Sequence, residues 1–292
     1  MPSPSQTQPA VPAKVPDLAS LRAELDRLDD TLHNTLMRRA EVVKQVAALR
    51  VKGPVPLRPG REAAIIRRLL ARHDGGLPAF GIVRIWRELL GTTTAQQHPL
   101  VVSVCEAGGD PAYLALAREH FGALTPMRPH RSPAEALDEV RAGHATVAVL
   151  PMPAEGEAPS DAWWTALLHL GGPQVHVVAR LPFWSPRPEG APIVQGLVVS
   201  AAAPDPSGQD CSLLGLELAG AGRAELGVAL AASGFRAGLV IVRRGTDASA
   251  ACALAEVDGF IGDDDARLAA LRKAGYLPMV LGAYAVPVGG EA

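Results

Sequence analysis

Leucine and valine side chains recur at steps of three and four residues near the start of the chain. The positions are Leu18, Leu21, Leu25, Leu28, Leu32, Leu36, Val43, Val46 and Leu49. This spacing aligns the side chains along one helix face, and no glycine or proline interrupts Asp17 to Lys52. The pattern predicts one helix of about 35 residues, roughly 50 Å long, with Asp17 as its N-cap. Because such a length is unusual within one small domain, we expect a dimer to share the helix; a long monomeric coiled-coil arm is the alternative.

Two shorter helices are predicted between the Gly53-Pro54 break and His98. One covers 61–73, with Pro59 at a favourable first position, and ends before Gly75-Gly76. The other follows Pro78, runs toward Gln96-Gln97, and carries its apolar residues on one side: Ile82, Ile85, Trp86, Leu89 and Leu90. Residues 17–98 are therefore predicted to form an all-α, three-helix domain. Residues 1–16, rich in proline, serine and alanine, are predicted to be a disordered leader.

After His98-Pro99 the sequence changes to short β-type runs with fewer charges. Strands are predicted at 101–105, 146–150, 175–179 and 193–200, with helices at 111–121 and 133–142, which indicates an α/β segment over residues 99–205. Residues 204–209 are predicted to be a linker. A β-α-β-β-α-β order then follows over 210–288, with strands at 212–218, 238–243, 252–261 and 279–286 and helices at 224–232 and 264–274. That order is typical of a ferredoxin-like α+β layer. The predicted fold class is therefore multidomain.

Composition and charge narrow the function classes. Hydrophobic residues make up 48% of the 292 residues, enough for a core in each of two or three domains, and the formal net charge is −2. A chain without an overall positive charge is a poor partner for nucleic acid or an anionic membrane, and we expect neither. Cys105, Cys211 and Cys252 lie far apart without a CxxC pair, so we expect no zinc site, no disulfide framework and a cytoplasmic location.

Candidate chemistry lies in the arginines of the long predicted helix. Arg39, Val46 and Arg50 follow one another at steps of seven and four residues, which places them on one helix face. Arg22 is rotated by roughly 100° from that face and displaced by about 25 Å, so it cannot serve the same pocket from the same helix. It would reach the pocket of a partner subunit if two such helices run antiparallel. The alternative is that these arginines are ordinary exposed charges.

Several short motifs occur together along residues 17–98. They are the stretch Leu21-Arg22-Ala23-Glu24-Leu25-Asp26-Arg27-Leu28-Asp29, the pair Arg38-Arg39, the turn Arg58-Pro59-Gly60-Arg61-Glu62 and the pair Gln96-Gln97. In this order and spacing the segment resembles the intertwined-helix chorismate mutases and covers nearly their whole fold. The resemblance implies an isomerase that rearranges chorismate to prephenate in the shikimate pathway to phenylalanine and tyrosine. It also implies a homodimer with shared active sites and no cofactor.

The resemblance assigns three catalytic residues, Arg39, Arg50 and Gln97. Arg39 and, from the other subunit, Arg22 would hold the two carboxylates of chorismate, because guanidinium groups bind carboxylates in bidentate geometry. Arg50 and Gln97 would donate hydrogen bonds to the ether oxygen, where negative charge develops as the C–O bond breaks. The rearrangement needs no nucleophile or general base, so positioning and electrostatics would supply the rate.

The remaining substrate-binding residues are Arg58, Glu62 and Thr93. By resemblance, Glu62 would hold the substrate hydroxyl, with Thr93 nearby. Some family members have an acidic residue where Arg58 stands, which leaves Glu62 as the hydroxyl partner. The family commonly has lysine where Arg50 stands, and Lys52 is a substitute donor if the helix register slips.

Residues 99–205 resemble a shortened, degenerate prephenate dehydratase. Glu106-Ala107-Gly108-Gly109-Asp110-Pro111 stands where that family has its first loop, and Val149-Leu150-Pro151-Met152-Pro153 stands where it has a Pro-x-Glu-Asn-Ser sequence. Its Thr-Arg-Phe motif, which bears the catalytic threonine, corresponds to Val194-Gln195-Gly196. The threonine is absent and the segment is too short for a second lobe. The sequence therefore predicts that dehydratase activity is lost.

Residues 210–288 resemble an ACT domain, a regulatory module that follows dehydratases. The matching segments are Cys211-Ser212-Leu213-Leu214, Gly259-Phe260 and Leu281-Gly282-Ala283-Tyr284. The resemblance implies an aromatic amino acid as effector. Phenylalanine-binding members carry Gly-Ala-Leu and Glu-Ser-Arg-Pro segments, where this chain has Ala224-Glu225-Leu226 and Ile241-Val242-Arg243-Arg244. Effector binding therefore stays open at this point.

Three functions are compatible with this sequence. The one we expect is a monofunctional chorismate mutase with degenerate dehydratase-like and ACT-like extensions. A bifunctional chorismate mutase and prephenate dehydratase is the second. The third is a non-catalytic subunit that senses an aromatic metabolite or assembles with another enzyme of the pathway.

Overall fold

The computed structural model of the chain describes residues 17–49, 56–168, 173–218, 222–244 and 251–289. Its contacts divide into two compact units, Met1–Val51 and Lys52–Ala292. The boundary falls inside the segment predicted as a three-helix domain, because the second and third helices belong to the larger unit. That unit therefore holds helical residues from the predicted mutase segment together with the whole β-sheet.

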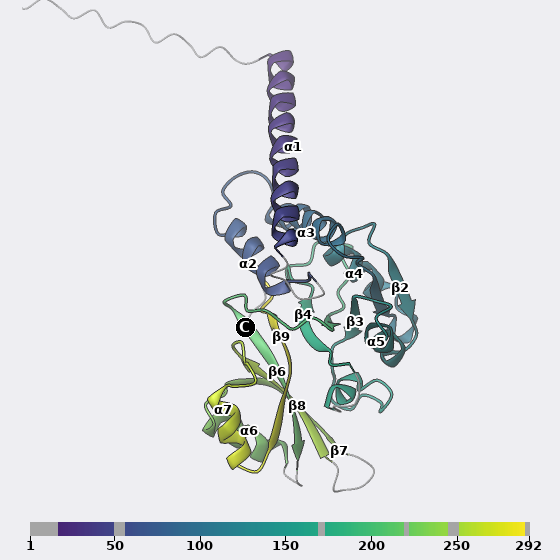
Figure 1. Cartoon of the computed structure of the whole chain (residues 1–292), viewed down its shortest axis with the longest axis vertical. Helices are drawn as coiled ribbons and strands as arrows, with labels where there is room; N and C mark the ends of the chain where they lie inside the picture. The colour runs from purple at the N-terminus through teal and green to yellow at the C-terminus, as the bar shows by residue number, and fades with distance from the viewer. Residues whose placement is uncertain (1–16, 50–55, 169–172, 219–221, 245–250, 290–292) are drawn as a thin grey trace, which may run out of the picture. The chain divides into compact units, whose positions relative to one another are not determined.

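The smaller unit contains helix α1 (Leu18–Ala48) (Figure 1). As predicted, Asp17 is its N-cap, and the Asp17 side chain accepts a hydrogen bond from the Ser20 backbone N–H at 2.7 Å. The predicted apolar row is largely exposed, for example 59% at Leu25 and 55% at Leu28. Among the described residues, none of the helices combines the length and the apolar character needed to cross a lipid bilayer.

Helices α2 (Pro59–Leu70) and α3 (Ala79–Ala95) open the larger unit. They pack together through Ala63, Ile66, Val83 and Leu90, which form one buried cluster. The apolar residues of these helices recur at helical spacing, so their burial on one side follows from the sequence pattern. Both helices were predicted from the sequence, and the structure confirms them.

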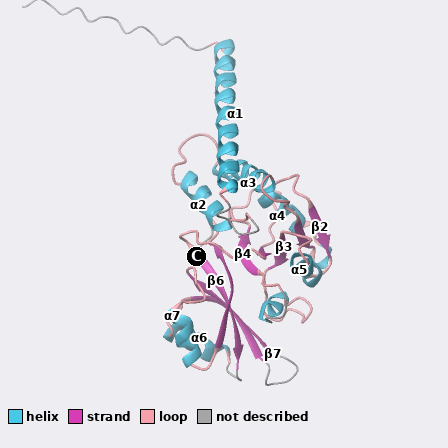
Figure 2. Ribbon diagram, viewed as in Figure 1, coloured by secondary structure: helices cyan, strands magenta, loops and turns pink. Residues whose placement is uncertain are grey.

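The described strands of the larger unit form a nine-stranded sheet, with strand order β2-β1-β3-β5-β4-β9-β6-β8-β7. Figure 2 shows the strands in magenta. Its strands are β1 (Val102–Cys105), β2 (Met127–His130), β3 (Val147–Pro151), β4 (His176–Leu181), β5 (Gly196–Ser200), β6 (Asp210–Leu218), β7 (Ala237–Arg244), β8 (Ala251–Asp258) and β9 (Leu277–Ala285). The first three are parallel, and β5 pairs antiparallel with β3 and β4. The helices between strands are α4 (Ala112–Phe121), α5 (Pro133–Arg141), α6 (Arg223–Ala232) and α7 (Ala266–Lys273), with short 3-10 helices at Ala107–Gly109 and Trp163–Leu168.

The last part of the chain follows the predicted β-α-β-β-α-β order, β6-α6-β7-β8-α7-β9, in an antiparallel arrangement. Helices α6 and α7 lie together on one face of these strands (Figure 1). Leu226 and Leu230 of α6 and Leu268 of α7 pack there against β6 residues such as Leu214. This is the split β-α-β layer typical of ferredoxin-like folds.

Two features differ from the sequence prediction. Strand β2 was not predicted, because its sequence contains Pro129, which cannot donate a ladder hydrogen bond; the strand is tolerated at the sheet edge.

The α/β and α+β segments also share one sheet, since β4 pairs parallel with β9 at Val177 and Gly282. A Cβ atom on Gly282 would lie 2.1 Å from the Val177 carbonyl oxygen. Only glycine permits this approach, and its φ of +141° also favours glycine.

Candidate active site

The arginines predicted to hold chorismate lie on α1, in the smaller unit. Arg22 is exposed and Arg39 is half-buried. At 1.5 Å per residue the two lie about 25 Å apart along the helix, so one helix cannot bring both to one small ligand. Arg50 and the substitute donor Lys52 lie outside the described residues.

The first turn of α2 is fixed by a carboxylate from a distant loop. Arg58 occupies the N-cap position without a capping side-chain hydrogen bond. Instead, Asp205 accepts hydrogen bonds from the backbone N–H groups of Gly60 at 2.9 Å and Arg61 at 3.0 Å. Its carboxylate also accepts one from the Arg58 Nε at 3.1 Å. Asp205 therefore caps α2 and orients the Arg58 guanidinium at the same time.

Glu62 lies one turn further along α2 and is held by Arg87 of α3. The Arg87 Nη1 lies 3.1 Å from the Glu62 Oε2, and only 5% and 15% of the respective side chains are exposed. Burial lowers the pKa of the Arg87 guanidinium to about 10, and the Glu62 and Glu119 carboxylates oppose that effect. The guanidinium also lies 4.9 Å from the ring centre of Phe183, a favourable cation–π arrangement.

His120 of α4 completes this buried group. Its Nε2 lies 3.4 Å from the Arg87 Nη1. Because an arginine can only donate, this contact requires an imidazole whose Nε2 accepts. Burial, with the charge of Arg87 as a smaller contribution, lowers the pKa of His120 well below its usual value near 6.5. The histidine is therefore neutral at physiological pH.

Thr93 lies in the last turn of α3, and Gln97 lies four residues later, just after the C-cap Gln96. The buried Thr93 hydroxyl donates to the carbonyl oxygens of Leu89 at 2.8 Å and Leu90 at 3.1 Å. The Gln97 Nε2 donates to the Thr93 carbonyl at 2.8 Å. These hydrogen bonds fix both side chains along the helix.

The structure thus brings Thr93 and Gln97 together, whereas Arg58 and Glu62 are held by different partners. Sequence reasoning missed both of these partners, Asp205 and Arg87. One signal was present for Arg87, which lies four residues after Val83 and three before Leu90, on the apolar stripe of α3. No comparable signal marked Asp205, which lies in a segment predicted to be a linker.

A second polar cluster lies beside the segment that corresponds to the dehydratase motif. Arg180 of β4 donates to the Gln195 Oε1 at 3.0 Å, and its Nη1 lies 3.7 Å from the Glu256 carboxylate. The Tyr284 hydroxyl donates to Glu256, and burial together with that carboxylate raises the tyrosine's pKa. These four residues line a cavity of about 420 Å³, which Cys211 also lines. Gln195 is therefore part of a polar network at the edge of β5.

Known proteins similar to this chain fall into two groups. Residues 21–98 match the family model described as chorismate mutase type II. Curated relatives are bifunctional chorismate mutase/prephenate dehydratases. That of Pseudomonas aeruginosa is 29% identical over 141 residues, covering 46% of this chain and 38% of the relative. That of Aquifex aeolicus is 26% identical over 141 residues, covering 47% and 39%. The chain thus spans less than two fifths of the length of these relatives.

Solved structures that show some similarity to this chain include two prephenate dehydratases. The Staphylococcus aureus protein is 12% identical with a TM-score of 0.48, covering 63% of this chain and 100% of that protein. The complex of the Arthrobacter aurescens protein with L-Phe is 16% identical with a TM-score of 0.47, covering 66% and 92%.

Proposed function

We propose that this chain, whose residues 21–98 match the chorismate mutase type II family, is a chorismate mutase that converts chorismate to prephenate. The family match carries the proposal. It is supported by the order of the site residues: Arg22 and Arg39 on α1, Arg58 and Glu62 at the start of α2, and Thr93 and Gln97 at and just after the end of α3. With Arg50, they supply the cationic and polar groups that a dicarboxylate substrate requires.

In the proposed reaction, the ether C–O bond of chorismate breaks while a C–C bond forms within the same molecule. Arg39 and Arg22 of the partner subunit bind the carboxylates. Arg50 and Gln97 stabilise the negative charge that grows on the ether oxygen. Glu62 accepts a hydrogen bond from the substrate hydroxyl. No proton is transferred and no cofactor is needed, so the site acts by holding one conformation and by its fixed charges.

The proposed homodimer is supported by the surface of α1. Its apolar residues follow the 3,4 spacing of a helix–helix seam yet remain exposed, with Leu21 at 47% and Leu32 at 56%. A contiguous apolar row of this length is typical of an interaction surface. A second copy of the chain supplies the matching helix, and an antiparallel arrangement carries Arg22 of one subunit to the pocket of the other.

We further propose that the chain lacks prephenate dehydratase activity. Gln195 stands in the segment that corresponds to the dehydratase motif, and its side-chain oxygen is bound to Arg180 at 3.0 Å. An amide offers neither a hydroxyl nor a general acid in place of the threonine. The test is to incubate the protein with prephenate at neutral pH and to measure phenylpyruvate. If dehydratase activity is lost, no enzymatic phenylpyruvate should form. Enzymatic phenylpyruvate would show that the activity persists.

The mutase proposal is tested by following the loss of chorismate ultraviolet absorbance with purified protein. We expect turnover above the uncatalysed rate, and an Arg39→Ala variant should lose it while staying folded and dimeric. Arg38→Ala is the matched control, because Arg38 is the exposed neighbour of Arg39 on α1. Absence of turnover in the unaltered protein would exclude the enzyme and favour a non-catalytic, ligand-sensing subunit.

A further inference from the structure

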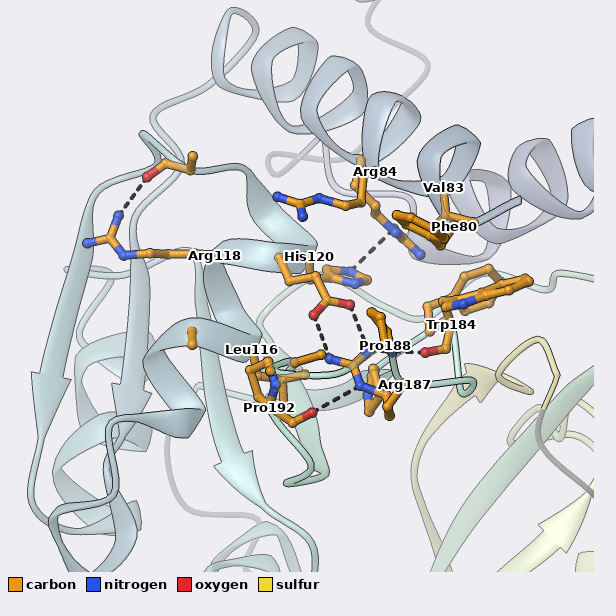
Figure 3. A pocket seen from close by; sticks show the side chains of 18 of the residues that line it. Phe80, Val83, Arg84, Leu116, Arg118, His120, Trp184, Arg187, Pro188 and Pro192 are labelled. Atoms are coloured by element: carbon orange, nitrogen blue, oxygen red, sulfur yellow. Dashed lines mark hydrogen bonds and ion pairs between the residues drawn. The ribbon is translucent and has the colours of Figure 1, made fainter. Parts of the chain in front are cut away.

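A cavity of about 430 Å³ lies in the larger unit, between α3, α4 and the segment from Pro182 to Pro192 (Figure 3). This volume is in the range of small-molecule binding sites. None of the residues assigned above to chorismate lines the cavity. The proposed reaction therefore does not account for it.

Rings form much of its wall. Phe80 of α3 and Trp184 lie on the same side of the cavity in Figure 3. Phe183 is buried behind them at 5% exposure, whereas Phe80 is 41% exposed. Pro188 and Pro192 contribute further apolar rings. Flat, rigid surfaces of this kind favour a ligand with a planar ring, because ring faces stack with little loss of side-chain entropy.

Two buried polar groups lie at the inner end of the cavity, Arg87 and His120. Within the described part of the chain, the hydrogen bonds of Arg87 to Glu62 and His120 both come from Nη1. A guanidinium has five N–H donors, so Nη2 and Nε still offer donors to a ligand. Neutral His120 adds no charge of its own. The inner end is therefore a sheltered site with cationic donors.

Four arginines and three glutamates line the cavity, which leaves an excess of one positive charge. Glu119 is bound to Arg187 at 2.6 and 2.9 Å, and Glu88 accepts from the Ala123 backbone N–H at 3.1 Å. Glu189 is exposed to solvent. Arg84 lies three residues before Arg87 on α3, and its side chain extends away from Phe80 in Figure 3. Arg84 forms no ion pair with any residue that the structure describes.

We propose that this cavity binds a small carboxylate that carries a planar ring. The ring lies against Phe80 and Trp184, and the carboxylate is bound by Arg84 at the outer side and by Arg87 at the inner side. Residues three apart on a helix are neighbours on its surface, so a carboxylate between the two side chains can bind both guanidinium groups. The apolar rings exclude water around the pair and strengthen its electrostatic attraction.

Arg87 also connects this site to the proposed active site, because its guanidinium holds Glu62. A carboxylate bound to Arg87 competes with Glu62 for that guanidinium. Ligand binding is therefore expected to loosen Glu62 and to raise the KM for chorismate. This consequence rests on the proposed mutase function, whereas ligand binding itself does not.

The test uses the full chain and 3-phenylpropanoate as the probe, with 3-phenylpropan-1-ol as its uncharged counterpart. Binding is followed by tryptophan fluorescence and by titration calorimetry, without chorismate. We expect saturable binding of the carboxylate and weaker binding of the alcohol. Arg84→Gln should weaken carboxylate binding by about tenfold, as expected for a lost charge-assisted hydrogen bond. Arg272→Gln is the matched control on the exposed side of α7 and should bind like the unaltered protein.

Two outcomes would overturn the proposal. One is no saturable binding up to about 10 mM of the probe, a range that detects even weak sites. The other is equal carboxylate binding by the Arg84→Gln variant and the unaltered protein. Phe80→Ala provides a second exposed variant, which should weaken binding of both the carboxylate and the alcohol. Because these measurements omit chorismate, a failure of binding is distinct from a failure of mutase activity.

Discussion

Arg87 on α3 and Glu62 on α2 form an ion pair of 3.1 Å between two largely buried side chains. The pair joins α2 and α3, which carry Glu62 and Thr93 and are flanked by Arg58 and Gln97. Arg87 also contacts His120 of α4 and the ring of Phe183, which follows β4. The same guanidinium therefore links the predicted mutase helices to α4 and to the segment after β4. Changes at this pair are therefore expected to affect both stability and the proposed activity.

Replacing Arg87 with methionine removes the charge and retains much of the packing. Removing one member of a buried ion pair costs about 3–5 kcal/mol, because the other charge loses its partner in a sheltered site. Glu62 keeps some exposure, so we expect the lower end of that range in urea denaturation. The double variant Glu62→Leu/Arg87→Met should recover most of the loss. A double variant whose loss equals the sum of the two single losses would show that the residues are not coupled.

Replacing Asp205 with alanine removes the capping carboxylate of α2. Loss of a helix cap costs about 1–2 kcal/mol, and we expect a decrease of that size in the free energy of unfolding. If Arg58 and Glu62 bind substrate, the freed helix start should also raise the KM for chorismate more than it lowers kcat. Asp258→Ala is a suitable control, because its ion pair with Arg236 is exposed and contributes little. Equal effects of the two substitutions would contradict this role for Asp205.

Two helix glycines should respond oppositely to alanine. A Cβ atom on Gly91 of α3 would lie 2.2 Å from the Phe121 carbonyl oxygen, so Gly91→Ala must separate α3 from α4. We expect a loss of about 1–3 kcal/mol. Nothing lies within 4 Å of a Cβ atom on Gly227 of α6. Gly227→Ala should therefore stabilise by about 0.5–1 kcal/mol, through the better helix propensity of alanine. Thermal unfolding of both variants checks the contrast.

Stability should fall in mildly acidic solution because of His120. Its pKa is well below 6.5 in the folded protein and near 6.5 in the unfolded chain, so the unfolded chain binds more protons between these values. The stabilising contribution is complete above pH 6.5 and is lost as the pH falls toward the folded pKa. Over this window the slope is about 1.4 kcal/mol per pH unit for one group. His120→Gln should reduce this slope, measured from the free energy of unfolding between pH 7.5 and pH 5.5; an unchanged slope would contradict the role of His120.

Much of the secondary structure could be predicted from periodicity. Asp17 caps α1 as expected, α3 begins after Pro78, and the order of β6, α6, β7, β8, α7 and β9 follows the prediction. These features depend on neighbours within a few residues, where spacing and capping chemistry act directly. Strand β2 could not be predicted in this way, because only its place at the sheet edge makes Pro129 acceptable.

The residues of the candidate site also fall into two groups, those that local motifs predicted and those that depend on distant contacts. Motif order alone identified Arg58, Glu62, Thr93 and Gln97 as candidates and related residues 17–98 to the intertwined-helix chorismate mutases. The match of residues 21–98 to the chorismate mutase type II model agrees with that resemblance. The groups that hold Glu62 and Arg58 were not predicted. Arg87 lies 25 residues from Glu62, and Asp205 lies 144 residues from Arg61. Local sequence patterns do not predict contacts between residues this far apart, because these contacts form only when the chain has folded.

Local sequence patterns thus predicted the helices, most of the strands and the resemblance of residues 17–98 to chorismate mutases, and they proposed the candidate substrate residues. The folded structure added that α2 and α3 pack in one unit with the sheet, and that β4 and β9 join two predicted segments at Val177 and Gly282. It also decided that Arg87 lies between Glu62 and a ring-lined cavity. Helix and strand preferences act over a few residues. Close packing and charge pairing instead depend on which segments, far apart in the sequence, pack together in the folded protein.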